Sequence, residues 1–390
     1  MIDNSGAVAS KARSGCYAMQ PGGHRAFIPA DLPPDPPVSF SSETWRLLSD
    51  ADRALGRLDA VTQTLPDTDL FLLMYVRKEA VLSSQIEGTQ ASLEDIIQFE
   101  ESVQDAESPD DVEEVVNYIR ALNHGLSRLG SLPVSLRLIR EVHAELMKGV
   151  RGRNRNPGEV RTTQNWIGGP GSDLQTALFV PPPPGAPLQN ALSGLERFIH
   201  DDPEMPVLVQ IALLHAQFET IHPFLDGNGR LGRLLITFLL CEKSVLEKPS
   251  LYISHFFKRH RSEYYDRLQA VRDDGAWEPW IDFFLRGVRD VAREGARTAG
   301  NILKLRENHR SLVADELSRA QAGSAATLMD AMFKTPVVSV ERAAAIIGRS
   351  YANANTLIGR LCELGVLEEV TGQRRNRLFR YGPYVALFRD

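Results

Sequence analysis

The sequence predicts a mainly α-helical protein with one small β-hairpin and a separate module at its C-terminal end. Three observations lead to this fold class. Apolar residues recur at three- and four-residue steps over most of the chain, which is the spacing of amphipathic helices. Residues 151–185 are instead rich in Gly, Asn and Pro, which indicates turns. Residues 325–390 carry nine Lys or Arg and six Asp or Glu, a net charge of +3 in a chain whose total is −6.

The N-terminal part divides into an irregular segment and a helical domain. Residues 1–40 are rich in Gly and Pro, and we expect them to be extended and irregular. Residues 41–120 are interpreted as a helical domain, because an apolar periodicity begins at Ser42 and a mostly apolar helix follows over 70–82. Polar residues at 83–89 are expected to interrupt that helix, and Ser92 is expected to cap the next one.

Residues 121–310 are interpreted as one helical core that contains the hairpin. Two short apolar runs, 166–167 and 178–180, flank a Gly-rich segment and predict two paired strands, the second of which is ended by four prolines. Helices before and within this core are predicted over residues 112–129, 136–148, 207–220, 231–243, 254–271 and 277–306.

Composition excludes several classes of protein. The net charge of −6 argues against a chain whose whole surface binds nucleic acid. The three cysteines are far apart and form no CxxC pair, so neither a zinc site nor a disulfide framework is indicated. The N-terminus has no apolar signal region, and the longest apolar run is too short to span a bilayer. We therefore expect a cytoplasmic protein with no membrane partner.

The segment His222-Pro-Phe-Leu-Asp-Gly-Asn-Gly-Arg-Leu-Gly-Arg233 concentrates groups that suit phosphate chemistry. A Gly-rich turn that opens a helix leaves backbone N–H groups unpaired at the positive end of the helix dipole. Its two arginines, three residues apart, share the helical face beside this turn. Asp226 offers a carboxylate to Mg²⁺, and His222, with an ordinary pKa of roughly 6.5, suits a general base. Each feature alone is commonly structural, but their combination within one segment indicates a site.

This segment matches HxFx(D/E)GNGRxxR at every defined position, and in this the chain resembles the Fic family. The resemblance implies a Fic-type helical core with a β-hairpin flap. It implies transfer of AMP from ATP to a Ser, Thr or Tyr hydroxyl of a target protein, or of the chain itself. His222 would be the catalytic base and Asp226 the Mg²⁺ ligand. The residues implied to bind ATP are Gly227, Asn228, Gly229, Arg230, Arg233 and Tyr265.

Two further segments extend the resemblance. Ser83-Ser-Gln-Ile-Glu87-Gly88 is similar to the family's inhibitory motif, (S/T)xxxE(G/N), which implies that Glu87 pairs with Arg233 and blocks productive ATP binding. Ser83 and Gly88 belong to the same motif, although a helix that ends at a C-capping Gly88 is the plain alternative. Removal of AMP from a target by a water oriented at Glu87 also remains open. Ile167, in the flap, is expected to hold the target chain or simply to pack the hairpin.

The C-terminal residues 325–390 resemble a winged helix-turn-helix domain. A helix is predicted over 338–348, and Ser350 is expected to cap a second one. Strands at 364–368 and 377–381 would flank a basic wing, 374–377. DNA is one partner for this module, and dimerisation or target docking is the alternative. A DNA-binding regulator with a weakly active Fic core is therefore the second interpretation of the whole chain, and a homodimer remains open.

Overall fold

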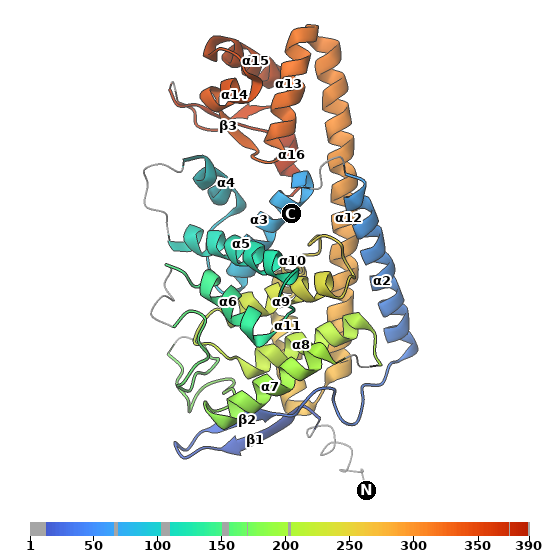
Figure 1. The fold of residues 1–390 in the computed structure, drawn as a ribbon, viewed down its shortest axis with the longest axis vertical. Helices are drawn as coiled ribbons and strands as arrows, with labels where there is room; N and C mark the ends of the chain where they lie inside the picture. The colour runs from blue at the N-terminus through green and yellow to red at the C-terminus, as the bar shows by residue number, and fades with distance from the viewer. Residues whose placement is uncertain are drawn as a thin grey trace.

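The computed structural model describes residues 13–65, 69–102, 110–149, 156–169, 171–201, 204–373 and 375–388. These residues are mainly helical, as the sequence predicts. The molecule is elongated, with an N-terminal hairpin at one end and the C-terminal module at the other (Figure 1). One 40-residue helix, α12 (Trp277–Glu316), runs along the side and connects the helical core to the C-terminal module.

A β-hairpin forms near the N-terminus, so the prediction of an irregular segment over 1–40 is wrong there. Strands β1 (Gly15–Met19) and β2 (Arg25–Pro29) pair antiparallel along their whole length. Phe27 is fully buried, and its ring meets the edge of Tyr17 with centroids 5.0 Å apart. This aromatic packing stabilises a hairpin in a segment whose Gly and Pro content alone indicated coil. Residues 1–12 of the predicted segment lie outside the described residues.

The N-terminal helices confirm the apolar periodicity. They are α2 (Ser42–Gln63), α3 (Asp69–Ile86), α4 (Leu93–Ser102), α5 (Asp110–Leu129) and α6 (Leu136–Leu146). Ser92 does cap α4, because its hydroxyl accepts from the Asp95 N–H at 3.2 Å. The expected interruption at 83–89 is wrong in its position, since α3 continues to Ile86. Ser83 and Ser84 are completely buried inside the protein, so they prolong the helix despite their polarity.

The core helices differ from the prediction mainly at their ends. They are α7 (Ala186–His200), α8 (Val207–Ile221), α9 (Asn228–Glu242), α10 (Ser254–Arg259) and α11 (Arg261–Asp274). No prediction was made for α7. The single helix expected over 254–271 is broken at His260, whose backbone leaves the helical region at φ −113°, ψ 38°. Helix α12 runs ten residues past its predicted end, and α9 begins three residues early, inside the Gly-rich turn.

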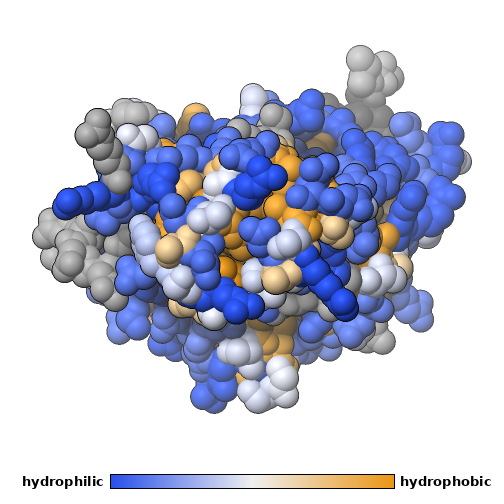
Figure 2. Space-filling view, turned by 90° about the horizontal axis from the view of Figure 1, so that it is seen from above, coloured by the Kyte–Doolittle hydropathy of each residue, from blue (hydrophilic) through white to orange (hydrophobic). Residues whose placement is uncertain are grey.

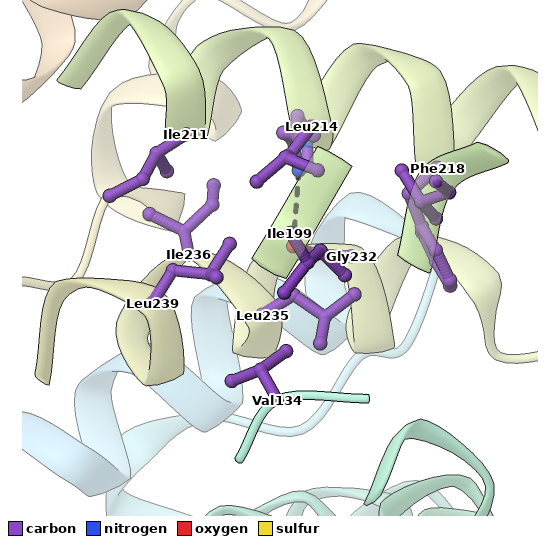
Figure 3. A pocket seen from close by; sticks show the side chains of 11 residues that line it. Val134, Ile199, Ile211, Leu214, Phe218, Gly232, Leu235, Ile236 and Leu239 are labelled. Carbon is purple, nitrogen blue, oxygen red and sulfur yellow. Dashed lines mark hydrogen bonds between the residues drawn. The ribbon is translucent and has the colours of Figure 1, made fainter. Parts of the chain in front are cut away.

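Helices α8 and α9 pack directly on each other and form the centre of the core. The cavity between them has a volume of about 10 Å³ and a mostly apolar lining (Figure 3). Across it, His215 Nδ1 is bonded to the carbonyl of Gly232 at 3.0 Å. A space of this size holds no nucleotide, so this cavity is not the ligand site.

The C-terminal module combines helices with a three-stranded sheet. Its elements are α13 (Arg319–Met332), β3 (Val337–Ser339), α14 (Val340–Ile347), α15 (Tyr351–Glu363), β4 (Glu368–Glu369), β5 (Leu378–Arg380) and α16 (Gly382–Ala386). The antiparallel sheet has the order β3-β5-β4. Seen from this end, the molecule is largely hydrophilic around a narrow hydrophobic band (Figure 2).

Several details of the module correct the prediction. The helix expected from residue 338 starts at Val340, because residues 337–339 are a strand. The strand expected over 364–368 is confined to Glu368–Glu369. Ser350 does cap α15, accepting from the Asn353 N–H at 3.3 Å. Arg374, in the expected wing, lies outside the described residues. Over the part of the chain that is described, none of the helices has the length and apolar character needed to cross a membrane.

Candidate active site

His222 lies at the point where α8 ends. It adopts a left-handed backbone conformation, φ 48° and ψ 62°, and its N–H donates to the carbonyl of Phe218 at 2.9 Å. A left-handed conformation costs a non-glycine residue about 1–2 kcal/mol, so the surrounding structure must hold it in place. The reversal turns the chain away from α8 and starts the loop that leads to α9.

The loop ends at Gly227, which precedes the first residue of α9. Gly227 is also left-handed, with φ 76°, and a Cβ added there would lie only 2.7 Å from Met147 Sδ. Glycine is thus required both by the backbone and by the neighbouring side chain. The first helical bond of α9 runs from the N–H of Leu231 to the carbonyl of Gly227. The N–H groups of residues 228–230 have no partner inside the helix, which is the arrangement that binds anions.

Asn228 fixes the shape of this loop through its side chain. Its Oδ1 accepts from the N–H of Phe224 and its Nδ2 donates to the carbonyl of Phe224, both at 2.9 Å. The side-chain amide is therefore committed to the loop. Only the backbone N–H of Asn228 therefore remains available for its expected contribution to ATP binding.

A neutral histidine on α6 supports the loop from the other side. The His143 ring stacks on Phe224 with centroids 3.8 Å apart. Its Nδ1 accepts from the N–H of Gly158 at 2.8 Å, so Nε2 carries the proton and donates to the carbonyl of Asp226 at 3.0 Å. Burial lowers the pKa of His143 to about 4, which agrees with this neutral state. His143 is thus a support of the loop.

Arg230 and Asp226 lie together at the edge of the loop. Arg230 is 4% exposed, and its Nη2 is 3.6 Å from Asp226 Oδ1. Its Nη1 donates to Oε2 of Glu114, on α5, at 3.2 Å, and the same oxygen accepts from the hydroxyl of Thr89. Asp226 is about half exposed, and its Oδ1 accepts from the N–H of Gly227 at 2.6 Å. Its carboxylate therefore reaches solvent beside the anion-binding turn.

Arg233 is held by the segment that ends α3. Its Nε donates to the Ser83 hydroxyl at 2.8 Å, and its Nη2 donates to the Ser83 carbonyl at 2.9 Å and to Glu87 Oε1 at 2.7 Å. Arg233 is 1% exposed, whereas the Glu87 side chain keeps 35% of its surface in solvent. The two segments singled out in the sequence are thus joined across 146 positions.

Glu87 also faces the anion-binding turn. A Cβ added to Gly229 would collide with Glu87 Oε1, so the carboxylate lies directly against the first turn of α9. Burial opposes ionisation of Glu87, but the Arg233 guanidinium outweighs it and holds the pKa of the carboxyl below its ordinary value. A negative charge therefore sits where an anionic ligand would approach. Gly88, with φ 106°, reverses the chain immediately after Glu87.

Tyr265 borders the same region from α11. Its side chain is 40% exposed, and the Arg261 guanidinium lies 5.7 Å from its ring centroid. Burial raises the pKa of Tyr265, with the Glu87 charge as the next cause, which places its hydroxyl within electrostatic reach of that carboxylate. The structure thus brings Tyr265 close to Glu87 and Arg233. Its expected contact with adenine stays a prediction.

The flap is shorter than predicted. Ile167 and Phe179 form an isolated antiparallel bridge, with N–H to carbonyl distances of 2.8 and 3.1 Å, and no longer strands flank it where the surrounding chain is described. The sequence located the pairing correctly but overestimated its length. The N–H of Phe27, on β2, donates to the carbonyl of Val180 at 2.9 Å. The N-terminal hairpin therefore supports the flap on the side away from Ile167.

The pKa of His222 is lower than the ordinary value that the sequence suggested. Its pKa is lowered to about 4, chiefly by burial and also by the nearby guanidinium groups of Arg272 and Arg161, against the opposing charge of Glu87. The imidazole is therefore neutral at physiological pH and free to accept a proton. Its Nδ1 is buried without a hydrogen-bond partner among the described residues.

Several residues of this site carried no prediction from the sequence. Glu114, His143, Arg161 and Asn165 all contact the motif or its loop. Arg161 and Asn165 had one signal, since both lie shortly before the strand expected at 166–167. Arg272, on α11, also carried no prediction from the sequence. It donates to the Thr220 hydroxyl and the Glu219 carbonyl, both at 3.2 Å.

Comparison with known proteins identifies the regions that form this site. Residues 45–127 match the model described as Fic/DOC family N-terminal, and residues 133–240 match the model described as Fic/DOC family. The chain is 35% identical over 128 residues to the protein adenylyltransferase Fic of Culex quinquefasciatus, covering 32% of this chain and 22% of that one. It is 29% identical over 209 residues to a probable protein adenylyltransferase of Aquifex aeolicus, covering 52% of this chain and 57% of that one.

A solved structure extends the comparison to the fold. A Fic family protein from Desulfovibrio desulfuricans superposes with a TM-score of 0.56 at 19% identity, covering 88% of this chain and 97% of that one. The chain spans only about a fifth to just over half of the two curated relatives. The two family models together cover both the Glu87 segment and the Arg233 loop. This chain therefore carries a Fic/DOC domain preceded by the N-terminal region of the same family.

Proposed function

We propose that this chain is a protein adenylyltransferase that moves AMP from ATP to a Ser, Thr or Tyr hydroxyl of a target protein and of itself. One observation carries the proposal. A neutral histidine, an open helix N-terminus and two buried arginines converge on a single loop, His222 to Arg233. The Fic/DOC family model matches residues 133–240, which contain this loop, and two relatives of the chain are named as adenylyltransferases; both findings support the assignment.

The chemistry follows from the charges of the loop. In the proposed reaction, the N–H groups of residues 228–230 and the α9 dipole bind phosphate oxygens. Arg230 and Arg233 neutralise charge that develops on the leaving pyrophosphate. The neutral His222 takes the proton of the target hydroxyl as its oxygen attacks the α-phosphorus. The bond to the β-phosphate oxygen breaks, and pyrophosphate leaves. Catalysis is thus mainly positioning and charge stabilisation.

Mg²⁺ is the cofactor that this proposal includes. The described residues contain no group of three or more candidate ligands, so a metal held by protein alone is not supported. A single half-exposed carboxylate beside a phosphate site does suit Mg²⁺, which keeps several waters and takes its other ligands from phosphates. Asp226 would hold the ion, which would supply neutralisation of phosphate charge.

We further propose that Glu87 restrains the enzyme. Its carboxylate occupies Arg233 and lies against Gly229, so it competes with the outer phosphates of ATP for both groups. ATP could then bind only with its phosphates displaced from the productive position. An alternative role of the same carboxylate, orienting a water that removes AMP from a modified target, uses the same geometry.

Labelling with ATP that carries ³²P in the α-phosphate tests this proposal. Three proteins are compared: the wild type, Glu87→Gly, and the double variant that also carries His222→Ala. We expect weak self-labelling of the wild type, strong labelling of Glu87→Gly and none of the double variant. Equal labelling with and without His222 would refute its role. If the wild type instead removes label from pre-labelled Glu87→Gly protein and releases it as AMP, hydrolytic removal of AMP is established.

A second function concerns the C-terminal module. We propose that residues 325–390 form a winged helix, because α14 and α15 lie next to a β3-β5-β4 sheet whose last two strands flank a basic loop. Binding to random duplex DNA with an affinity that falls steeply with salt would support a DNA role. Absence of binding, or binding that does not depend on salt, would favour target docking or dimerisation instead.

A further inference from the structure

Arg161 is a buried cation in the segment that precedes the flap. It is 3% exposed, and among the described residues its guanidinium has no carboxylate partner. Its donors go instead to backbone carbonyls, at distances of 2.6 to 3.4 Å; these belong to Thr163, Pro182, Ile221 and His222. Burial lowers the pKa of Arg161 to about 10, which reflects the cost of removing this charge from water.

Two of these carbonyls belong to the end of α8. Arg161 Nε donates to the carbonyl of His222 at 3.0 Å, and Nη2 reaches that of Ile221 at 3.4 Å. The backbone N–H of Arg161 also donates to the carbonyl of Pro223 at 2.9 Å. The left-handed backbone of His222 is thus held by hydrogen bonds from a residue outside its own loop. Asn165 adds a bond from Nδ2 to the carbonyl of Phe224 at 2.8 Å.

The same guanidinium also bonds to the segment that follows the flap. Nη2 of Arg161 donates to the carbonyl of Pro182 at 2.6 Å, three residues beyond the bridge between Ile167 and Phe179. A second arginine makes a parallel connection, because the Phe179 ring lies 4.0 Å from the Arg272 guanidinium. Arg272 in turn donates to the carbonyl of Glu219, near the end of α8. The second strand of the flap and the residues just after it are therefore tied to the segment that carries His222.

We propose that Arg161 is a positioning residue. It fixes the backbone of His222 relative to the flap, so that the His222 imidazole and the hydroxyl of a target bound at the flap keep a fixed relative position. This inference rests on the proposed function, in which His222 is the base. Three charged side chains act on the His222 ring, those of Arg272, Arg161 and Glu87, and Glu219 contributes only through a hydrogen bond of its backbone. Arg161 is the one that bonds directly to the His222 carbonyl.

Variants of Arg161, made in the Glu87→Gly protein so that activity is measurable, test this role. Arg161→Gln removes both the charge and the fork of donors, whereas Arg161→Lys keeps the charge but reaches fewer carbonyls. We expect the maximal rate of self-modification to fall about 10- to 100-fold in Arg161→Gln, with a KM for ATP within about threefold of the parent. Arg161→Lys should recover only part of the rate. Arg197→Gln, which changes a 70% exposed arginine, is the matched control.

A readout that does not need activity completes the test. In the proteins with isotope-labelled histidine rings, His222 should titrate about one pH unit higher in Arg161→Gln than in the parent, because a neighbouring positive charge is lost. It should stay near the parent value in Arg161→Lys. A folded Arg161→Gln variant with an unchanged rate and an unchanged His222 titration overturns the inference. If Arg161→Gln does not fold, a fully active Arg161→Lys overturns it equally.

Failure of the proposed function and failure of the positioning role would give different experimental results. If the Glu87→Gly parent transfers no AMP at all, the proposed function is wrong, while the His222 titration still decides whether Arg161 acts on that residue. If the parent is active and only the Arg161 effects are absent, the function stands and the positioning role does not.

Discussion

Replacement of Glu87 by glycine should raise the rate of AMP transfer by about 10- to 30-fold. The carboxylate accepts one charge-assisted bond from Arg233 at 2.7 Å. Hydrogen bonds to charged groups contribute about 1.5–3 kcal/mol. Because 35% of the Glu87 side chain is exposed, solvent screening favours the lower part of that range, about 1.5–2 kcal/mol. If Arg233 must leave Glu87 before it can bind the outer phosphates, this energy adds to the barrier, and about 1.4 kcal/mol is a factor of ten in rate.

The assay is the initial rate of self-labelling by α-labelled ATP at saturating and limiting nucleotide. Glu87→Gln is the matched control, since it keeps the length of the side chain and one donor-acceptor pair but loses the charge. We expect Glu87→Gln to lie between the wild type and Glu87→Gly. The two Ser83 contacts to Arg233 remain in every variant, so Arg233 should stay near the site. A Glu87→Gly rate within twofold of the wild type would show that this ion pair does not limit transfer.

Three further predictions concern the same loop. Glu114→Gln should lower the free energy of unfolding by about 1–3 kcal/mol in a denaturant titration, because the 4% exposed Arg230 loses the nearer of its two carboxylate partners; an unchanged midpoint would show that the pair is not stabilising. Asn228→Ala should cost about 2–4 kcal/mol and abolish labelling, since both bonds that close the loop on Phe224 are lost; retained activity would contradict its structural role. The labelling rate should be flat from about pH 5.5 to 8, because the pKa of His222 is depressed to about 4 and the base is neutral throughout; an acid limb near pH 6.5 would mean that burial does not depress it.

The sequence was most informative where the chemistry is local. The turn between α8 and α9 could be predicted because its glycines, its asparagine and its arginines lie within twelve positions, and the helix N-terminus follows directly from them. The Ser92 and Ser350 caps were predictable for the same reason, since a cap bonds within its own first turn. In each case the partners are neighbours along the chain.

The remainder depended on contacts between distant segments. Glu114 pairs with Arg230 across 116 positions, and Arg161 bonds to His222 across 61 positions. No local sequence pattern predicts either contact. The depressed pKa of His222 likewise arises from burial and from Arg272 and Arg161, which lie on other elements. An isolated imidazole would titrate at roughly 6.5, so its local sequence could not reveal the shift.

Two elements of the fold were obscured by their own composition. Helix α7 starts directly after a run of prolines, with Pro187 in its first turn, where proline is tolerated because no N–H is needed. Its Leu188, Leu192 and Leu195 do recur at helical spacing, but the preceding prolines indicated a loop. The N-terminal hairpin was missed because its Gly-rich turn resembles coil, while its stability comes from packing of Phe27 against Phe179 and the flap.

The most direct test of the central claim compares two labels in one reaction. The Glu87→Gly protein is incubated with Mg²⁺ and with ATP that carries ³²P in either the α- or the γ-phosphate, and the protein is then analysed for incorporated label and for the added mass. AMP transfer predicts label from the α-phosphate, none from the γ-phosphate, and a mass increase of one adenylyl group. Incorporation from the γ-phosphate, or no incorporation from either position, would contradict the assignment of the His222 to Arg233 loop as an adenylyl-transfer site.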